Sequence, residues 1–305
     1  MSENKSSHSE LGEGAPAPAA AKPREALLNE PAEKNLVRSL AKGFAVLRAF
    51  RADAPELTLS EIARAAGLDN ATAFRLTNTL LMLGLVARVP NSRRFSLTLA
   101  CLDLGFNAIA RSDLRTLARP LLRGLVGAPV EAASIGVLDG ASVVYVERVQ
   151  AGLVRLGVDV RIGSRVPAYS SAIGHAILAF MPEAVQRAVL ASAPRPPLTD
   201  RTVTDLDALV ARLATVRAAG FAVSDQETVT GLRVLAAPVR DADGVPIAGL
   251  SVAAPAFAAS LEDFVAAAEE PVCSAAAALS RALQAAGSVA LPETLPMAQA
   301  RRDAQ

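Results

Sequence analysis

Catalysis and metal binding need particular side chains at particular spacings, and few positions in this chain meet that need. Its two histidines, His8 and His175, form no cluster of metal ligands. The sequence contains no nucleophile elbow, P-loop or dinucleotide glycine pattern. Ser170 and Ser171 lack a neighbouring base, and an N-cap for a helix starting at Ala172 explains them. We therefore expect no enzymatic activity, no metal and no cofactor; an enzyme that processes a small molecule, with an accessory helical domain, is the alternative.

Contact with DNA is a second kind of chemistry, and it fits residues 57–86, LTLSEIARAAGLDNATAFRLTNTLLMLGLV. The last helix of this stretch has an apolar side formed by Phe74, Leu76, Leu80 and Leu83. Its other side offers donors for base edges and phosphates, and two arginines follow in a turn. The residues expected to contact DNA are Asn70, Thr72, Ala73, Arg75, Thr77, Asn78, Arg93 and Arg94. For each of them taken singly, capping or solvation is the competing explanation.

The charge of this region differs from that of the whole chain. The 31 basic and 30 acidic residues leave a formal net charge of +1. Between Lys34 and Ala100, however, ten basic residues face only four acidic ones, so this segment carries +6. A local excess of positive charge is what phosphate binding requires.

These side chains need a helix pair to position them, and the sequence predicts one. Apolar residues within 35–50 recur at three- and four-residue steps, which indicates a first helix. Thr58-Leu59-Ser60-Glu61 has the form of a capping box, so a second helix begins there. Gly67 suits the left-handed end of that helix, and Asp69 suits the N-cap of a third helix over 70–83.

A β-hairpin is expected after the third helix. Val86 to Val89 and Phe95 to Leu99 are rich in β-forming residues and flank Pro90-Asn91-Ser92-Arg93-Arg94. Two helices joined by a short glycine-containing turn and followed by such a hairpin form a winged helix-turn-helix.

The remaining sequence predicts an α+β domain. Its expected strands pair around Asp139-Gly140 and Asp243-Gly244, which are strong turn signals. The strands run over 132–138, 142–149, 232–240 and 245–252. The helices run over 172–180, 183–191, 206–219 and 261–283. A GAF-like antiparallel sheet with flanking helices is the simplest arrangement.

Length and composition set the domain boundaries, because 305 residues of which 51% are hydrophobic suffice for two cores. We expect a disordered tail over 1–34, a DNA-binding domain over 35–100, a linker helix over 101–125, the α+β domain over 126–285 and a flexible tail over 286–305. No stretch has the ~18 to 20 apolar residues of a membrane span, and no signal peptide occurs. With Cys101 and Cys273 as reduced thiols, we expect a soluble, cytoplasmic protein with no membrane partner.

Several motifs resemble the IclR family of bacterial transcriptional regulators. In the first domain they are SLAKGFAVLRAF, LTLSEIARAAGLDNATAFRLTNTLLMLGLVAR and RRFSLTLACLDLG. In the second they are VPAYSSAIGHAILA and FAVSDQETVTGLRVLAAPVRDADGVPIAGLSVAAP. The resemblance covers about residues 35 to 285 and implies a DNA-binding regulator whose α+β domain binds a small effector. RIGSRVPAYSSAIG and SDQE…GLR are most similar to the branch that controls catabolism of aromatic acids such as protocatechuate, p-hydroxybenzoate and β-ketoadipate.

The resemblance also implies an effector pocket between the sheet and the surrounding loops and helices. Matching the motifs residue by residue, the lining residues are Ala168, Tyr169, Ser170, Ser171, Ser224, Asp225, Val234, Ala236, Ser251 and Ala253. The family often has a polar or thiol residue at Val234 and a serine at Ala253. These two departures favour a larger, partly apolar effector over a very small polar one.

A carboxylate effector would need a donor near these motifs. The candidates are Arg161, Arg165, His175 and Arg233. Arg233 is also expected to pair with Asp225 or Glu227, and the Ala- and Ile-rich surroundings of His175 favour a packing role.

Three partners are expected: a double-stranded DNA operator, a carboxylate effector and further copies of the chain. A lone winged helix reads few bases, so pairing into a dimer or tetramer on a palindromic site is expected. The first helix and the linker helix from Gly105 to Leu125 are the candidate interface. The sequence does not determine the effector, the operator or whether the protein activates or represses.

Overall fold

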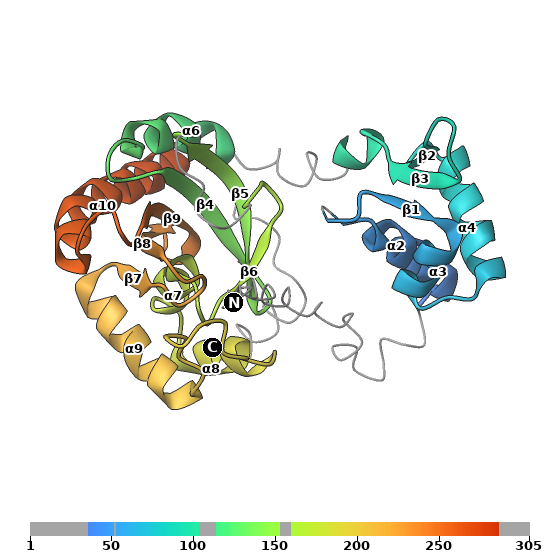
Figure 1. The fold of residues 1–305 in the computed structure, drawn as a ribbon. Helices are drawn as coiled ribbons and strands as arrows, with labels where there is room; N and C mark the ends of the chain where they lie inside the picture. Colours follow the sequence, from blue (N-terminus) through green and yellow to red (C-terminus); the bar gives the residue numbers. More distant parts are fainter. Residues whose placement is uncertain (1–35, 52, 104–113, 153–159, 287–305) are drawn as a thin grey trace, which may run out of the picture. The chain divides into compact units, whose positions relative to one another are not determined.

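The computed structural model describes residues 36–51, 53–103, 114–152 and 160–286 (Figure 1). The chain forms two compact units, one ending at Cys101 and the other beginning at Leu102. The tail expected over 1–34 lies outside the described residues. So do all but Ala286 of the tail expected over 286–305, and residues 104–113 of the expected linker helix.

The first unit contains the predicted helix-turn-helix. Helix α2 (Arg38–Ala49) is followed by α3 (Leu59–Ala66) and α4 (Asn70–Met82). Only Gly67, Leu68 and Asp69 separate α3 from α4. The core of this unit joins α2, α3 and α4 through Val46, Ile62 and Leu80.

The predicted caps fix where α3 and α4 begin. The Thr58 hydroxyl accepts from the Glu61 amide at 3.4 Å, and the Glu61 carboxylate accepts from the Thr58 amide at 2.8 Å, which completes the capping box. Gly67 ends α3 with a φ of +66°, a conformation that costs glycine little. The Asp69 carboxylate then accepts from the Thr72 amide at 2.8 Å. Hydrogen bonds from these amides lower the pKa values of Glu61 and Asp69, so both carboxylates complement the positive ends of their helices.

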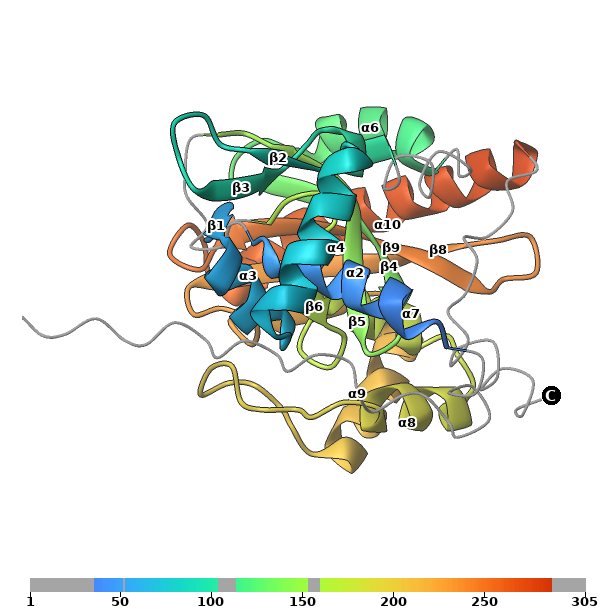
Figure 2. The ribbon, with the colours of Figure 1, turned by 90° about the vertical axis from the view of Figure 1, so that its right-hand side faces the viewer.

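The wing is a three-stranded sheet rather than a two-stranded hairpin. Strands β2 (Val86–Arg88) and β3 (Arg94–Leu97) form the predicted hairpin and end one and two residues earlier than expected. Its loop projects beyond the helices (Figure 2). A third strand, β1 (Glu56–Thr58), pairs with β3 and sets Leu57 opposite Phe95. Three residues are too few to show a strand period, so the sequence did not predict it.

The second unit is an antiparallel sheet of six strands in the order β6-β5-β4-β9-β8-β7. The two predicted hairpins form its centre: β4 (Ala132–Asp139) with β5 (Ser142–Gln150), and β8 (Leu232–Arg240) with β9 (Pro246–Pro255). The short strands β6 (Arg165–Pro167) and β7 (Ala222–Asp225) form the edges and were not predicted. The α+β fold class is therefore confirmed for both units.

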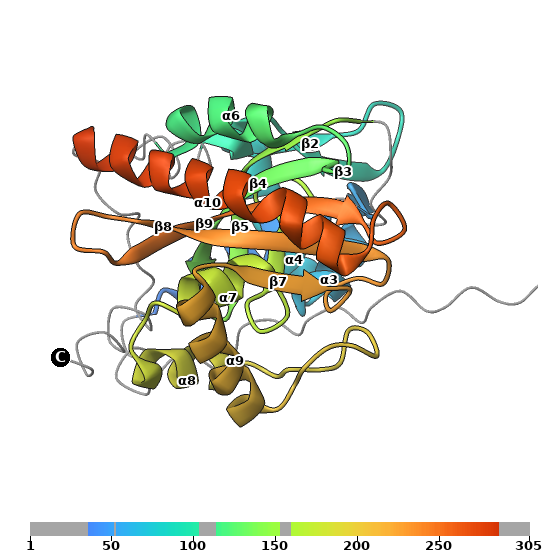
Figure 3. The same ribbon diagram turned by 90° about the vertical axis from the view of Figure 1, so that its left-hand side faces the viewer.

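Helices cover both faces of this sheet (Figure 3). Helices α6 (Leu114–Leu125) and α10 (Leu261–Ala285) pack on one face, called here the α10 face. Helix α7 (Ala172–Leu178) packs on the other, the α7 face, with α8 (Glu183–Ala191) and α9 (Leu206–Ala219) beyond it.

Helix α7 lies unusually close to the sheet. A Cβ atom at Gly249 of β9 would come within 2.9 Å of the Ile173 side chain, and one at Gly174 would come within 2.3 Å of the Ala168 carbonyl. Glycine at 249 therefore lets α7 rest directly on β9, and glycine at 174 lets the segment before α7 pack against that helix.

Candidate DNA-binding surface and effector site

Helix α4 presents only part of the predicted set of DNA-contacting side chains. Asn70 and Arg75 are exposed, and Thr72 and Asn78 are half-buried. Ala73 and Thr77 are 0% and 1% exposed, which corrects the expectation that they face outward. Together with Leu80 they form a buried stripe at steps of four and three residues, the spacing of one helix face.

Two apolar side chains of α4 are likewise placed differently from the expectation. Phe74 and Leu83, expected in the core, are 51% and 65% exposed. Ala73 and Thr77 lie on the buried side of α4, and Phe74, one position after Ala73, lies on the exposed side. A hydrophobicity pattern alone does not distinguish these two orientations.

The two wing arginines differ in their surroundings. Arg94 donates to the Glu56 carbonyl at 2.8 Å and to the Glu61 carboxylate at 3.2 Å, so it ties the wing to the start of α3. Arg93 is exposed and makes no ion pair or hydrogen bond through its side chain within the described residues. Of the two, Arg93 has the cation available for phosphate.

Most of the other cations in this unit are similarly available. Arg51 is paired with Asp53 at 2.9 Å. Within the described ranges, the exposed cations without an ion pair are Arg38, Lys42, Arg48, Arg64, Arg75, Arg88 and Arg93. An exposed, unneutralised set of this kind is what a phosphate backbone attracts.

In the second unit, strand register brings five of the predicted effector residues onto the α7 face. One row across the strands holds Ser224, Val234 and Ala253, and continues to Ala132. The next row holds Ala236 and Ser251, and continues to Ser134. Because neighbouring strands lie ~4.8 Å apart, each row is a continuous strip of side chains.

The segment before α7 completes this surface. Ala168, Tyr169, Ser170 and Ser171 are all buried. The Ser170 carbonyl accepts from the Ser224 hydroxyl at 3.2 Å and from the Thr228 hydroxyl at 2.8 Å. Ser171 caps α7 by accepting from the Gly174 amide at 3.1 Å, as the sequence predicted. Thr228 was missed because a single threonine in a loop carries no pattern.

Asp225 is the exception among the predicted lining residues. It alternates with Ser224 along β7, so its side chain lies on the side of Val223, toward the α10 face. Its carboxylate accepts from Arg233 Nε at 2.8 Å and from Arg201. Burial raises the pKa of Asp225, but these hydrogen bonds outweigh it and the net shift is downward. The expectation that Asp225 shares a surface with Ser224 is therefore corrected. Arg233 forms the ion pair with Asp225 that the sequence offered as the alternative to effector binding.

Comparison with known proteins matches both units to one family. The model described as "IclR helix-turn-helix domain" matches residues 39–90, and "Bacterial transcriptional regulator IclR C-terminal" matches residues 106–281. The chain belongs to the IclR family. It is therefore a DNA-binding transcriptional regulator with a C-terminal effector-binding domain, and not an enzyme.

Three relatives illustrate the similarity. The chain is 34% identical to the HTH-type transcriptional regulator KdgR of Escherichia coli K12, over 75% of this chain and 88% of that protein. It is 32% identical to the Pca regulon regulatory protein of Pseudomonas putida, over 77% of this chain and 80% of that protein. It is also similar to the crystal structure of an IclR homolog from Microbacterium hydrocarbonoxydans complexed with 4-hydroxybenzoate. That match has a TM-score of 0.69 and 29% identity, and covers 81% of this chain and 99% of the homolog.

His175 of this IclR-family protein packs in the core, as expected. It is fully buried, and its Nε2 lies 2.7 Å from the Tyr169 carbonyl. A carbonyl only accepts, so Nε2 carries a proton. Burial lowers the pKa of His175 to about 4, against the opposing effect of this hydrogen bond. His175 therefore holds the segment before α7 in place.

The remaining arginine candidates lie away from the shared surface. Arg165 pairs with the Asp139 carboxylate at 2.6 Å on the edge strand β6. Arg161 is exposed in the segment before β6. Neither side chain belongs to the two rows of the α7 face.

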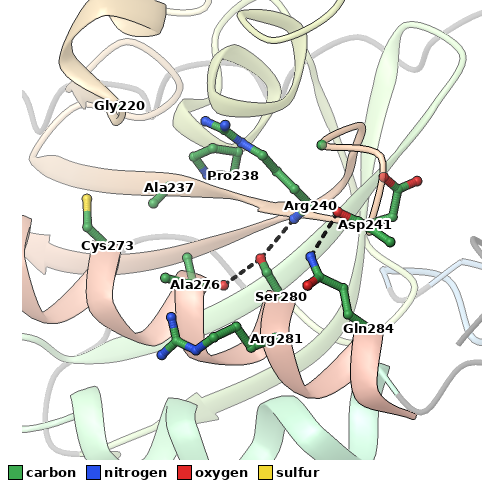
Figure 4. A pocket seen from close by; sticks show the side chains of 13 residues that line it. Gly220, Ala237, Pro238, Arg240, Asp241, Cys273, Ala276, Ser280, Arg281 and Gln284 are labelled. Carbon is green, nitrogen blue, oxygen red and sulfur yellow. Dashed lines mark hydrogen bonds between the residues drawn. The ribbon is translucent and has the colours of Figure 1, made fainter. Parts of the chain in front are cut away.

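A groove of about 440 Å³ lies between α10 and the end of the β8–β9 hairpin (Figure 4). Ser280 accepts from the Arg240 amide at 2.9 Å, and Gln284 donates to the Asp241 carbonyl at 2.9 Å, so hydrogen bonds close its floor. The Arg240 guanidinium stacks 3.8 Å from the centre of the Phe180 ring. No predicted effector residue lines this groove. A smaller hollow of about 110 Å³ does include Ala168 and Tyr169.

The described residues contain no group of three or more His, Cys, Asp and Glu side chains that could hold a metal ion. No helix among them is long and apolar enough to cross a membrane.

Proposed function

We propose that the α7 face binds a carboxylate effector and that this binding changes operator affinity through α6. The supporting observation is the strand register, because Ser224, Val234 and Ser251 share that face beside Ser170. Serine hydroxyls suit carboxylate oxygens, and the alanine and valine side chains suit an apolar body. A surface of this mixed kind fits an acid that is partly apolar.

Within carboxylates, we favour an aromatic acid. Val234 and Ala253 add apolar surface where the family resemblance implies polar groups. The Pca regulator and the homolog complexed with 4-hydroxybenzoate support this choice. KdgR is as similar as either, so aliphatic acids belong in the same screen.

The proposed DNA-reading residues are Asn70, Thr72, Arg75, Asn78 and Arg93. Asn70, Arg75 and Arg93 are exposed, and Arg75 and Arg93 have no ion pair within the described part of the chain. We assign 35–100 to operator binding, 101–125 to the link and 126–285 to the effector, in a protein that works in the cytoplasm.

The protein is further proposed to act as a dimer or a dimer of dimers. Apolar side chains at the start of the first unit support this: Val37 and Leu40 are each 61% exposed, and Phe44 is 45% exposed. Such a stripe on α2 is suited to burial against a second copy. Light scattering should give at least twice the monomer mass at micromolar concentration, and monomer alone would contradict the proposal.

Thermal-shift measurements against a panel of aromatic and aliphatic acids test the effector class. An acid at ~100 times its dissociation constant should add ~2.7 kcal/mol to stability. The same acid should then change binding to a duplex that the protein has selected from a random pool. If every acid leaves both the melting temperature and DNA binding unchanged, the carboxylate class is wrong.

A further inference from the structure

Strand β5 contains an irregularity that redirects its side chains. Ser134 pairs with Arg148 and Ile135 with Glu147, but Gly136 pairs with Tyr145, so Val146 is an extra residue in β5. Val146 packs in the core of the α10 face. Glu147 also turns toward α6, where its carboxylate accepts from Arg115 Nε at 2.6 Å. This is a β-bulge, which re-aims the residues on either side of it.

The bulge puts Tyr145 and Arg148 on the same face. In a regular strand, residues three apart point to opposite faces. Here Tyr145 packs in the core of the α7 face, and Arg148 lies opposite Ser134, which belongs to that face. Arg148 Nη1 donates to the Ser134 hydroxyl at 3.1 Å, so the guanidinium is directed along the row.

That row is the one that contains Ser251. Arg148, Ser134, Ser251 and Ala236 follow one another across four neighbouring strands. Ser251 is 3% exposed, and its hydroxyl makes no hydrogen bond within the described ranges. A cation and a hydroxyl group thus lie on either side of Ser134.

We propose that Arg148, oriented by Ser134, binds the carboxylate of the effector, with Ser251 as a second donor and the Val234 and Ala253 row beside its apolar body. This inference rests on the proposed carboxylate effector and adds the residue that recognises it. Arginine is suited to the role because its planar fork matches two carboxylate oxygens. The sequence pattern concealed it, since regular alternation would have put Arg148 and Tyr145 on opposite faces.

The arginines first considered from the sequence do not compete for this role. Arg233 is held by Asp225, and its guanidinium also donates to the Ala256 carbonyl at 3.1 Å. Arg165 is paired with Asp139 on the edge strand. Arg148 differs from both in its place, because it lies in the row of the α7 face and donates there to the Ser134 hydroxyl.

The test is equilibrium binding of 4-hydroxybenzoate and of its uncharged analogue, 4-hydroxybenzamide, to the full chain, with the other acids of the panel beside them. Wild type should prefer the acid. Arg148→Gln should weaken acid binding by about 10- to 100-fold, the effect expected for losing a hydrogen bond to a charged group, and leave the amide almost unchanged. Arg148→Lys should recover part of the loss because it keeps the charge without the fork. Ser134→Ala should weaken acid binding by a smaller factor.

Arg165→Gln is the matched control, since it removes an arginine from the same sheet outside the row, and it should bind the acid as wild type does. Melting temperature and effector-free DNA binding show that each variant is folded. Equal acid affinity in wild type and in Arg148→Gln or Arg148→Lys would overturn the role of Arg148 and leave the carboxylate effector standing. If wild type binds no acid of the panel, the carboxylate effector fails and the Arg148 assignment fails with it.

Discussion

The arginines of the two units are used in opposite ways. In the DNA-binding unit, exposed cations such as Arg64, Arg75 and Arg93 are left without ion pairs among the described residues. In the effector-binding unit, arginines such as Arg212 and Arg233 are held by buried or half-buried carboxylates at 2.6 and 2.8 Å. Arg212 and Arg233 therefore hold the second unit together, whereas the unpaired cations of the first unit are the ones proposed to contact phosphate. Counting arginines near a motif does not separate these roles, whereas the partners of each guanidinium do.

Among these arginine pairs, loss of the Glu147 carboxylate should have the largest effect on stability. This carboxylate is 1% exposed and holds Arg115 at 2.6 Å and Arg119 at 3.6 Å, which joins α6 to β5. Glu147→Ala should lower the free energy of unfolding by about 3 kcal/mol, the lower end for breaking a buried pair, because both arginines are partly exposed.

Urea denaturation of the full chain measures that loss. Glu183→Ala, which removes the exposed pair with Arg187, is the control and should cost far less, because solvent screens an exposed pair. Equal losses in the two variants would contradict a structural role for the arginines around Glu147.

A second effect should appear in acid. The pKa of His175 is about 4 in the folded protein and 6.5 when unperturbed. Between these two pH values the unfolded chain binds a proton at His175 and the folded chain does not. The stability that neutral His175 contributes is present above pH 6.5 and is lost as the pH falls toward 4. The loss is about 3 kcal/mol at ~1.4 kcal/mol per pKa unit.

His175→Asn should remove that part of the pH dependence. Stability measured between pH 7 and pH 4 should then fall less steeply in the variant than in wild type. His175 is the one histidine in the described part of the chain, so parallel curves for the two proteins would show that it already accepts a proton when folded.

Removing unpaired cations from the first unit should have a smaller effect, confined to DNA binding. Arg75→Ala and Arg93→Ala should each weaken binding by about 1 to 2 kcal/mol and reduce the slope of log K against log salt by about one per lost phosphate contact. Arg187→Ala, in the other unit, is the control. Unchanged slopes at Arg75 and Arg93 would remove both from the interface.

Arg94→Ala should behave differently from Arg93→Ala. Because Arg94 bonds to the Glu56 carbonyl and the Glu61 carboxylate, its loss should lower melting temperature as well as DNA affinity. The fall in melting temperature should be small, because solvent screens an exposed pair of this kind. A variant that loses affinity at constant melting temperature would assign Arg94 to DNA contact alone.

The sequence was sufficient for features encoded by a few adjacent residues. Thr58 and Glu61, Gly67 and Asp69 predicted the helix pair because caps and turns depend on local chemistry. Asp139-Gly140 likewise predicted the turn between β4 and β5. The edge strands β6 and β7 were missed, since three or four residues show no period.

The side-chain directions could not be predicted because they depend on packing. Nothing local distinguishes Thr77, which is buried, from Arg75 and Asn78 beside it. Asp225 was expected with Ser224, yet alternation along β7 separates them. The bulge at Val146 shows only in the pairing of β5 with β4, and so Arg148 was not among the sequence candidates.

The most direct test of the account is a reciprocal titration of the acid that most raises the melting temperature against the selected duplex. If the effector-binding unit controls the DNA-binding unit, the acid must change DNA affinity by the same factor as DNA changes acid affinity, about 5- to 150-fold. Ser251→Leu, which fills the α7 face, should reduce that factor to one while effector-free DNA binding and melting temperature stay near those of wild type. Control of DNA binding by the effector-binding unit would be contradicted if the acid and DNA did not change each other's affinity in wild type. It would also be contradicted if Ser251→Leu, at wild-type melting temperature, left that change in affinity as it is in wild type.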